Sequence, residues 1–337
     1  MRRHRTTARG GLSLILALGL TAGVAAASTG TQPGDGGPGP ATKPKPKPKP
    51  ASHTTAPAAR VSAERIVFPV VGKVQYTNDF GAPRSQGAHE GNDLMAPRKA
   101  LAVAAEAGKV KFWTHSGSAG CMLYLYGKSG TTYLYIHLNN DLTNGNDNRG
   151  RCVAGTSYAP GLKNGQKVQA GQLIGFVGDS GDANGVAPHL HFELHPHDGG
   201  AVSPYKYLNR AYRPLFATLP GSKFTLSLSG KVVSATLDDS LSATLKIDVK
   251  SLRAWPGGFR VPNVNRTITM TVDADDDIQQ LASGPATAAL SVSLQRLIAA
   301  KKGQALTVKT AAAPKKLEAQ LGRGAFDAAT VVLAPKS

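Results

Sequence analysis

Three histidines lie close together in the segment "GVAPHLHFELH", which runs from Gly185 to His195. Apolar and polar residues alternate along it, which predicts a β-strand in which residues two apart face the same way, about 6.6 Å from each other. His189 and His191 would therefore share one face, and both imidazoles could approach one metal ion. His195 lies on the same face, but it is about 20 Å from His189 and too far away to share that ion.

Further ligands for such an ion lie upstream. The segment "GAHEGNDLMAP" contains His89 and Asp93, and "LYIHLNN" places His137 at the end of a predicted strand. A catalytic zinc ion takes three protein ligands and keeps a fourth position for water. A lone histidine on a strand is usually structural, whereas His-x-His, His-x3-Asp and a further histidine together predict a metal site.

The elements that must position these side chains are short strands. Residues 61–212 contain segments rich in β-branched and aromatic residues, separated by Gly, Asn and Asp, and no long amphipathic helix. The segments are "IVFPVVG", "KVKFWTH", "CMLYLYG", "TTYLYIHL", "QLIGFVGDSG" and "HLHFELH". We expect a mainly antiparallel β domain with a long polar loop at 139–161, a length at which loops are often functional.

Blocks of this region, from about residue 68 to 208, resemble the lysostaphin/LytM-type zinc metalloendopeptidases. They are "FGAPRSQGAHEGNDLMAP", "LAVAAEAGKV", "TTYLYIHL", "LKNGQKVQAGQLIGFVGDSG" and "PHLHFELH", in that order. The resemblance implies a β-sheet groove in which His89, Asp93 and His191 bind one zinc ion. It also implies that His137 and His189 act in catalysis and that a zinc-activated water hydrolyses peptide cross-links of bacterial peptidoglycan.

Some roles within this site stay open. One of the two catalytic histidines would take a proton from water, and the other would donate a hydrogen bond to the developing oxyanion or the leaving amine. Glu193 either orients His191 through its second ring nitrogen or is a carboxylate at the rim of the groove. Some family members carry a tyrosine shortly before the first ligand histidine, where this chain has "APRSQG".

Other functions compete with the zinc endopeptidase. A catalytically silent wall-binding protein, or an activator of other wall hydrolases, would typically lack a ligand position, whereas all five positions are filled here. A secreted peptidase that acts on proteins also stays open. The motif Gly178–Gly181, "GDSG", is found in trypsin-like peptidases, but no suitable His and Asp contexts precede it.

The two cysteines, Cys121 and Cys152, favour a disulfide over a catalytic thiol. An even count in an exported chain is typical of a structural disulfide. A reactive thiol would need a base nearby to lower its pKa, and neither cysteine begins a clear helix. The disulfide would tie the 139–161 loop to the strand that begins at Cys121.

The N-terminal region predicts export and attachment rather than fold. Residues 1–27 have the basic, apolar and small-residue order of a signal peptide, and 28–60 form a Lys/Pro-rich spacer. Nine Lys/Arg and one Asp give 1–60 a charge of +8, fourteen and eleven give 61–212 a charge of +3, and sixteen and nine give 213–337 a charge of +7. We therefore expect a secreted protein whose linker and tail contact anionic cell-wall polymers, with no nucleic-acid partner and no membrane span.

The C-terminal residues, 213–337, form a second predicted domain. Their apolar and polar residues alternate in several segments, which predicts a small mainly-β domain, and we expect a barrel of the OB type. One helix is expected at 286–302. The predicted fold class of the whole chain is thus mainly β: an antiparallel β-sheet groove followed by a small barrel.

Overall fold

The computed structural model describes residues 65–85, 87–220, 223–239, 241–282, 289–311, 316–323 and 326–335. The predicted signal peptide (1–27) and linker (28–60) lie outside these residues. The strands form an N-terminal group and a C-terminal group, and each is described by itself. No helix in the described ranges is long and apolar enough to cross a membrane.

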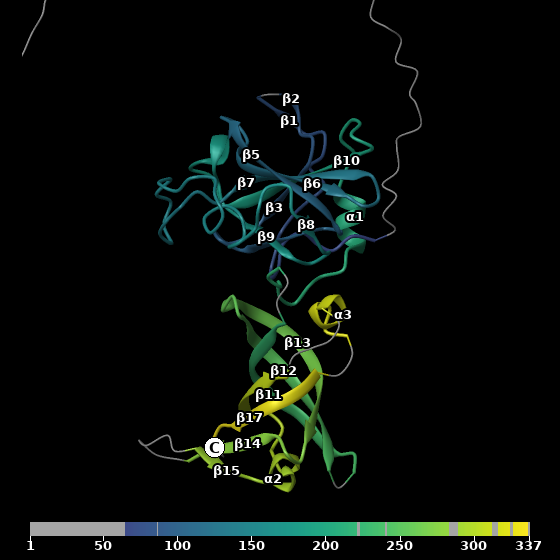
Figure 1. Ribbon diagram of the computed structural model, residues 1–337, viewed down its shortest axis with the longest axis vertical. Helices are drawn as coiled ribbons and strands as arrows, with labels where there is room; N and C mark the ends of the chain where they lie inside the picture. The colour runs from purple at the N-terminus through teal and green to yellow at the C-terminus, as the bar shows by residue number, and fades with distance from the viewer. Residues whose placement is uncertain are drawn as a thin grey trace, which may run out of the picture. The chain divides into compact units, whose positions relative to one another are not determined.

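The N-terminal group is built on a six-stranded antiparallel sheet with the order β3-β10-β7-β6-β5-β8 (Figure 1). Its strands are β3 (Asn92–Met95), β5 (Gly108–Ser116), β6 (Gly120–Gly127), β7 (Thr131–Leu138), β8 (Lys167–Val168) and β10 (His189–Pro196). Two smaller antiparallel pairs accompany it: β1 (Pro83–Arg84) with β2 (Gly87–Ala88), and β4 (Leu101–Val103) with β9 (Leu173–Phe176). The short helices of this region are η1 (Gly181–Ala183) and α1 (Tyr205–Arg210).

Strand β10 turns one face to the core and the other to the polar side of the sheet. Leu190, Phe192 and Leu194 are fully buried, and they alternate with the histidines and Glu193. Phe192 packs against Tyr133 and Tyr135 of β7, with ring centroids 5.9 and 5.2 Å away. Burying such an aromatic side chain stabilises the fold by about 1.5–3 kcal/mol, so the register of β10 is fixed by its apolar face.

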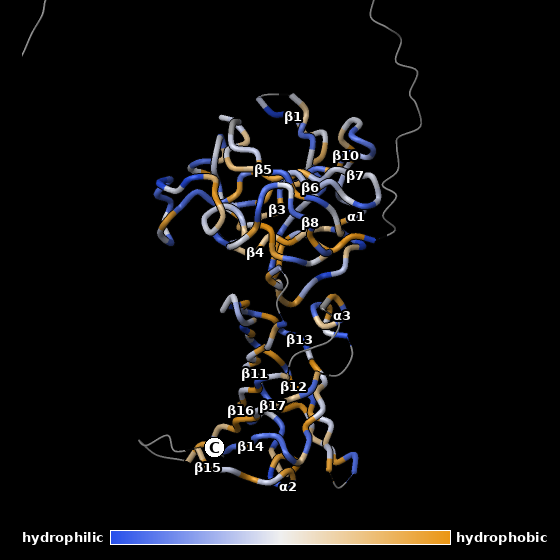
Figure 2. The backbone as a smooth tube through the Cα atoms, in the orientation of Figure 1, coloured by the Kyte–Doolittle hydropathy of each residue, from blue (hydrophilic) through white to orange (hydrophobic). Residues whose placement is uncertain are grey.

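The C-terminal group is a seven-stranded sheet with the order β13-β12-β11-β16-β17-β14-β15. Its elements are β11 (Thr225–Leu237), β12 (Ser242–Trp255), β13 (Phe259–Asp273), β14 (Asp277–Leu281), β15 (Ala289–Ser291), α2 (Leu294–Ile298), β16 (Ala305–Thr310), α3 (Lys316–Gln320) and β17 (Phe326–Leu333). A parallel pairing of β13 with β17 closes five of these strands, β11, β12, β13, β17 and β16, into a ring. Hydrophobic and hydrophilic residues follow each other along the long strands (Figure 2), as the alternation in the sequence predicted.

The mainly-β prediction is confirmed for both groups of strands, and the N-terminal sheet is antiparallel as expected. The assignment of the C-terminal ring to the OB type stays a prediction. The helix expected at 286–302 is wrong in extent, because among the described residues of this range, 289–302, only Leu294–Ile298 is helical. Ala289–Ser291 instead pairs with β14, so strand pairing overrides the local helix propensity of this alanine-rich stretch.

Candidate functional site

Three side chains of the predicted metal site meet beside strands β3 and β10. The Nε2 atom of His89 lies 2.8 Å from Nδ1 of His191, and Oδ1 of Asp93 lies 3.1 and 3.0 Å from these two nitrogens. Each residue offers one ligand atom within 4.8 Å of the others. The three side chains can therefore hold one metal ion, with two imidazole nitrogens and one carboxylate oxygen as ligands.

Strand pairing and one glycine make this convergence possible. Asp93 on β3 is the register partner of His191 on β10, so the two side chains stand next to each other in adjacent strands. Between His89 and Asp93, Gly91 lies so close to β10 that a Cβ atom there would be 2.6 Å from the carbonyl oxygen of Phe192 and 2.8 Å from Nε2 of His191. A side chain at this position would push His89 and β10 apart.

Each of the three ligand side chains has an outer partner. His89 donates its Nδ1 hydrogen to the carbonyl oxygen of Asp79 at 2.9 Å, which leaves Nε2 for an ion. The guanidinium of Arg84 donates to Oδ2 of Asp93 at 2.8 Å. The Nε2 atom of His191 lies 2.9 Å from Oε1 of Glu193. Partners of this kind fix the tautomer and orientation of metal ligands.

Two further histidines line the same cavity. His137, at the end of β7, donates Nδ1–H to the carbonyl oxygen of Ser180 at 2.8 Å, and His189 donates Nδ1–H to that of Ala187 at 2.9 Å. Their ring centroids are 5.1 Å apart, and that of His137 is 6.0 Å from His191. The cavity has a volume of about 570 Å³ and is lined by all five predicted site residues and by Arg84.

The environment sets the charge of these groups. Burial, together with the neighbouring His189 and His191, lowers the pKa of His137 to about 4, so its ring is neutral near pH 7. Burial alone would raise the pKa of Asp93, but the hydrogen bond from His191 and the imidazoles of His189 and His89 hold it well below its usual range. The site thus holds an ionised carboxylate ligand and a neutral imidazole at neutral pH.

Comparisons with known proteins match the part of the chain that holds these residues. Residues 87–204 match the family model described as Peptidase family M23. We call the matched residues the M23 domain, and the cavity with its five predicted site residues the M23 site. The chain is 28% identical over 155 residues to the L-Ala--D-Glu endopeptidase of Bacillus subtilis (strain 168), and the match covers 42% of this chain and 41% of that relative. The chain therefore spans less than half the length of the curated relative that it matches.

Two solved structures are also similar to part of this chain. The catalytic domain of lysostaphin from Staphylococcus simulans is 25% identical, with a TM-score of 0.31, over 41% of this chain and 92% of that one. A mutant catalytic domain of the prophage-encoded M23 protein EnpA from Enterococcus faecalis is 24% identical, with a TM-score of 0.30, over 41% and 97%. Both matches cover about two fifths of this chain.

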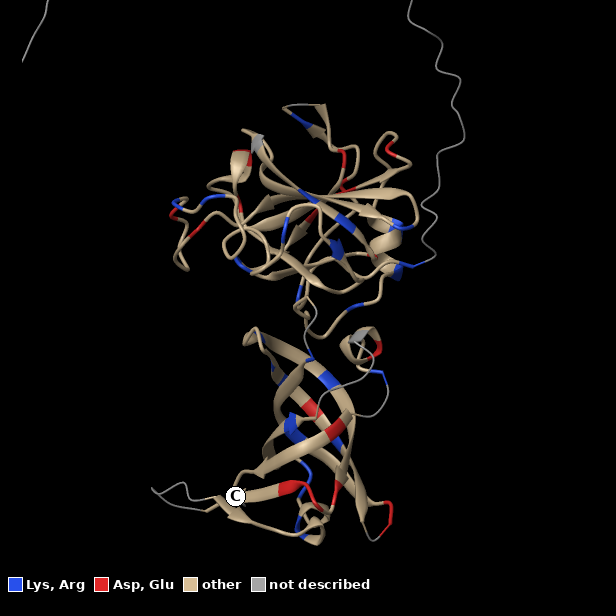
Figure 3. Cartoon of the chain, in the orientation of Figure 1, with Lys and Arg blue, Asp and Glu red and all other residues tan. Residues whose placement is uncertain are grey.

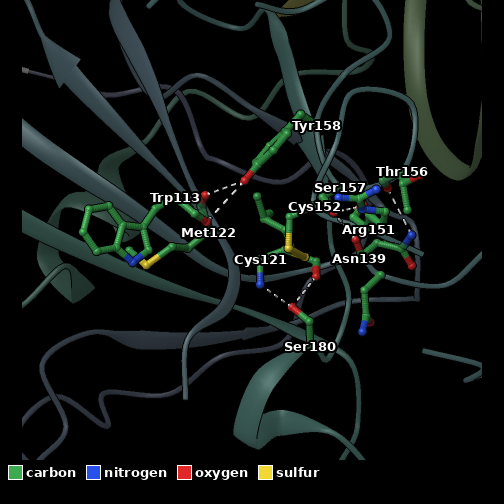
Figure 4. The surroundings of a disulfide bond; sticks show 12 residues. Trp113, Cys121, Met122, Asn139, Arg151, Cys152, Thr156, Ser157, Tyr158 and Ser180 are labelled. Carbon is green, nitrogen blue, oxygen red and sulfur yellow. Dashed lines mark hydrogen bonds between the residues drawn. A yellow bond between two sulfur atoms is a disulfide. The ribbon is translucent and has the colours of Figure 1, made fainter. Parts of the chain in front are cut away.

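The predicted disulfide between Cys121 and Cys152 is confirmed, and Figure 4 shows Ser180 next to it. The backbone N–H of Cys121 donates to Oγ of Ser180 at 2.9 Å, and that hydroxyl donates to the carbonyl oxygen of Leu138 at 2.6 Å. The carbonyl of Ser180 accepts the hydrogen bond from His137. The disulfide therefore ties the 139–161 loop of the M23 domain to the residues that hold this histidine.

His137 also has an uncommon backbone conformation. Its φ angle is 60°, in the left-handed region, which costs a residue other than glycine about 1–3 kcal/mol. Its amide donates to the carbonyl of Ala119, and its own carbonyl accepts from Gly178. A Cβ atom on Gly178 would lie 2.4 Å from Cα of Asn139, so glycine is required where this turn passes the end of β7.

The serine-peptidase interpretation of "GDSG" finds no support, since both polar side chains have structural partners. Asp179 is fully buried and accepts two hydrogen bonds from Arg98 at 2.6 and 2.7 Å. The hydroxyl of Ser180 is held by Cys121 and Leu138. This segment supports the M23 site rather than forming one of its own.

Sequence reasoning missed two neighbours of the M23 site. His195 stays outside the ligand cluster, as expected from its distance, but its Nε2 atom lies 2.6 Å from Oε2 of Glu193. Glu193 and His195 stand two residues apart on the face that also carries His189 and His191, and this spacing was the signal that could have linked His195 to Glu193. Arg84 comes from the β1–β2 turn, and only the tertiary fold brings it to Asp93.

Proposed function

We propose that this chain is an exported, zinc-dependent endopeptidase that hydrolyses peptide cross-links of bacterial peptidoglycan. The observation that carries the proposal is the convergence of His89, Asp93 and His191 in a cavity that also contains His137 and His189. Three protein ligands are the usual set of a catalytic zinc site, which leaves one position for water. When bound, zinc would lower the pKa of that water toward about 7 and polarise a peptide carbonyl.

The donor set fits zinc. Imidazole nitrogens and a carboxylate oxygen are ligands that Zn²⁺ accepts, and a ligand histidine normally donates its other N–H to a carbonyl or a carboxylate. His89 does so to the carbonyl of Asp79 and His191 to Glu193. Asp93 stays ionised at neutral pH because its pKa is held low.

The catalytic work of the protein itself would fall to His137 and His189. Both rings donate Nδ1–H to a backbone carbonyl, so both keep Nε2 for the substrate side of the cavity. One ring would accept the proton of the attacking water, and the other would donate a hydrogen bond to the oxyanion or the leaving amine. His137 is neutral at pH 7 because its pKa is lowered to about 4, so its Nε2 atom carries no hydrogen and has a free lone pair.

Digestion of purified peptidoglycan, followed by mass analysis of the products, tests the proposal against a silent wall-binding protein. We expect new peptide ends, among which the L-Ala–D-Glu bond named for the Bacillus relative is one candidate, and no new ends after zinc is removed by a chelator. Intact cross-links with zinc-loaded protein would contradict the proposal. A protein substrate such as casein, digested in parallel, tests the competing secreted protein peptidase.

We also propose a division of labour along the chain. Residues 1–27 would direct export, and the basic 28–60 linker and 213–337 domain would hold the 61–212 catalytic domain at anionic cell-wall polymers. Figure 3 marks the Lys and Arg positions on the C-terminal strands. The attachment surface would be the outer face of β12 and β13, where Arg253 lies directly opposite Arg260 in the adjacent strand.

This arginine pair favours an anionic partner. Like charges directly opposite each other destabilise a sheet, and neither arginine forms an ion pair with a carboxylate among the described residues. Ser227 is the register partner of Arg253 on one side and of Lys309 on the other, which extends the row of cations. Trp255 beside them is 46% exposed and offers a flat apolar ring to a sugar unit.

A further inference from the structure

Strand β10 continues the polar face of the metal site beyond its last ligand. Glu193 follows His191 at the next position of that face, and His195 follows Glu193. The two carboxylate oxygens are divided between the two rings: Oε1 lies 2.9 Å from Nε2 of His191, and Oε2 lies 2.6 Å from Nε2 of His195. The three side chains are only 12%, 9% and 19% exposed, in the order His191, Glu193, His195.

The hydrogen-bond partners define the protons of His195. Its Nδ1 atom lies 2.9 Å from the carbonyl oxygen of Gly199, which can only accept, so Nδ1 carries a hydrogen. Its Nε2 atom lies 2.6 Å from Oε2 of the Glu193 carboxylate, which also accepts. Nε2 therefore also carries a hydrogen, and His195 is an imidazolium ion paired with Glu193.

The same carboxylate defines the orientation of His191. By accepting the Nε2 hydrogen, Glu193 holds the ring of His191 so that Nδ1 points toward Nε2 of His89 and Oδ1 of Asp93. The cation of His195 balances the charge of Glu193, so a buried carboxylate is kept at this position without an unpaired charge. We propose that Glu193 and His195 act together as positioning residues that hold the His191 ring and set the affinity of the site for zinc.

A rigid piece of backbone anchors the far end of this arrangement. The turn after β10 is closed by a hydrogen bond from the amide of Gly199 to the carbonyl of Pro196 at 3.0 Å. The amide of His197 donates to the carbonyl of Gly130 at 2.7 Å, which ties the turn to the start of β7. The contacts from this turn through His195 and Glu193 to His191 thus begin on fixed backbone. The inferred effect on zinc affinity rests on the proposed zinc site.

Zinc affinity, measured by competition with a chromophoric chelator at fixed pH, tests the inference in the full chain. Glu193→Ala should weaken zinc binding by about 10–100-fold, the effect typical of an outer partner of a ligand histidine. Glu193→Gln should lose less, because its amide oxygen still accepts from His191 and its NH₂ can donate to a neutral His195. His195→Ala should fall between the wild type and Glu193→Ala.

The double variant decides whether the two residues act as one unit. Glu193→Ala with His195→Ala should bind zinc no more weakly than Glu193→Ala alone, because the second change removes nothing further. His197→Ala is the matched control: it lies beyond β10, is exposed and should bind zinc like the wild type. Circular dichroism of each metal-free variant checks that it is folded.

Cobalt substitution adds a readout that general destabilisation would not move. In fully Co²⁺-loaded Glu193→Ala, the visible absorption bands should shift, because the ring of His191 is no longer held in place. Wild-type zinc affinity in Glu193→Ala and His195→Ala, or additive losses in the double variant, would overturn the inference. Failure to cleave peptidoglycan by a wild type that binds zinc would instead overturn the proposed function and leave this inference intact.

Discussion

On both β10 and β12, polar side chains stand at every second residue, but those of β10 are largely buried and those of β12 are more exposed. On β10, His189, Glu193 and their neighbours are largely buried, and each polar group has a partner that fixes its protons. On β12, Arg253 stands exposed opposite a second arginine. Burial thus gives the proposed ion site on one alternating strand, whereas exposure gives the surface proposed to bind an anionic polymer on the other.

The largest effect expected on the β10 side is that of His191→Ala. It removes a ligand, so zinc and peptide cleavage should be lost together. His189→Ala, two residues earlier on the same face, should keep zinc and lose most of the rate. Zinc stoichiometry by elemental analysis and cleavage of a soluble peptide measure both. Loss of zinc in His189→Ala with retention in His191→Ala would exchange the two roles.

The next effect concerns His137, which comes from β7 rather than β10. His137→Ala should leave zinc bound while cleavage falls by about 10²–10⁴-fold, the usual contribution of a general acid or base. The Nδ1 atom of His137 donates to the carbonyl of Ser180 and not to a ligand side chain. No metal ligand therefore loses a hydrogen-bond partner in this variant. Single-turnover cleavage with matched zinc loading measures the change. An unchanged rate would reduce the role of His137 to structure.

A smaller effect is expected from the disulfide between Cys121 and Cys152. Replacing Cys121 and Cys152 together by Ser should lower the free energy of unfolding by about 2–4 kcal/mol, since the bond closes a 31-residue separation. Denaturant unfolding followed by circular dichroism measures this. Because the turn at Ser180 also depends on hydrogen bonds, we expect zinc to stay bound. A stability equal to that of the wild type would show that the loop is held without the bond.

The smallest effect belongs to the exposed strands. Arg253→Ser with Arg260→Ser should weaken binding to purified walls, measured by sedimentation, by about 30-fold at low salt, at about 1 kcal/mol for each of two cations near an anionic surface. The difference should vanish near 1 M salt, where the Debye length is about 3 Å. Lys246→Ser on the same strand, opposite Thr269, is the control. Equal binding of both variants and the wild type would exclude this face as the attachment surface.

Much of this site could be predicted from side-chain types and spacing. The alternation around His189 and His191 is enough to place both on one strand face, and resemblance to a family adds His89, Asp93 and His137. The disulfide also follows from the number of cysteines and the predicted export. Helix 286–302 could not be predicted correctly, because pairing of Ala289–Ser291 with β14 is a contact with a distant segment.

The sequence by itself determined the periodicities, the cysteine count and the set of groups able to bind a metal, since these depend on residue type and local spacing. Tertiary structure alone decided which of these groups meet. The ion pair of Glu193 with His195, the approach of Arg84 to Asp93 and the bond from His137 to Ser180 depend on the side-chain conformations and turns of the folded chain. Spacing along a strand gives the face on which a side chain lies, but hydrogen-bond geometry and burial, which only the fold supplies, decide its partner and its charge.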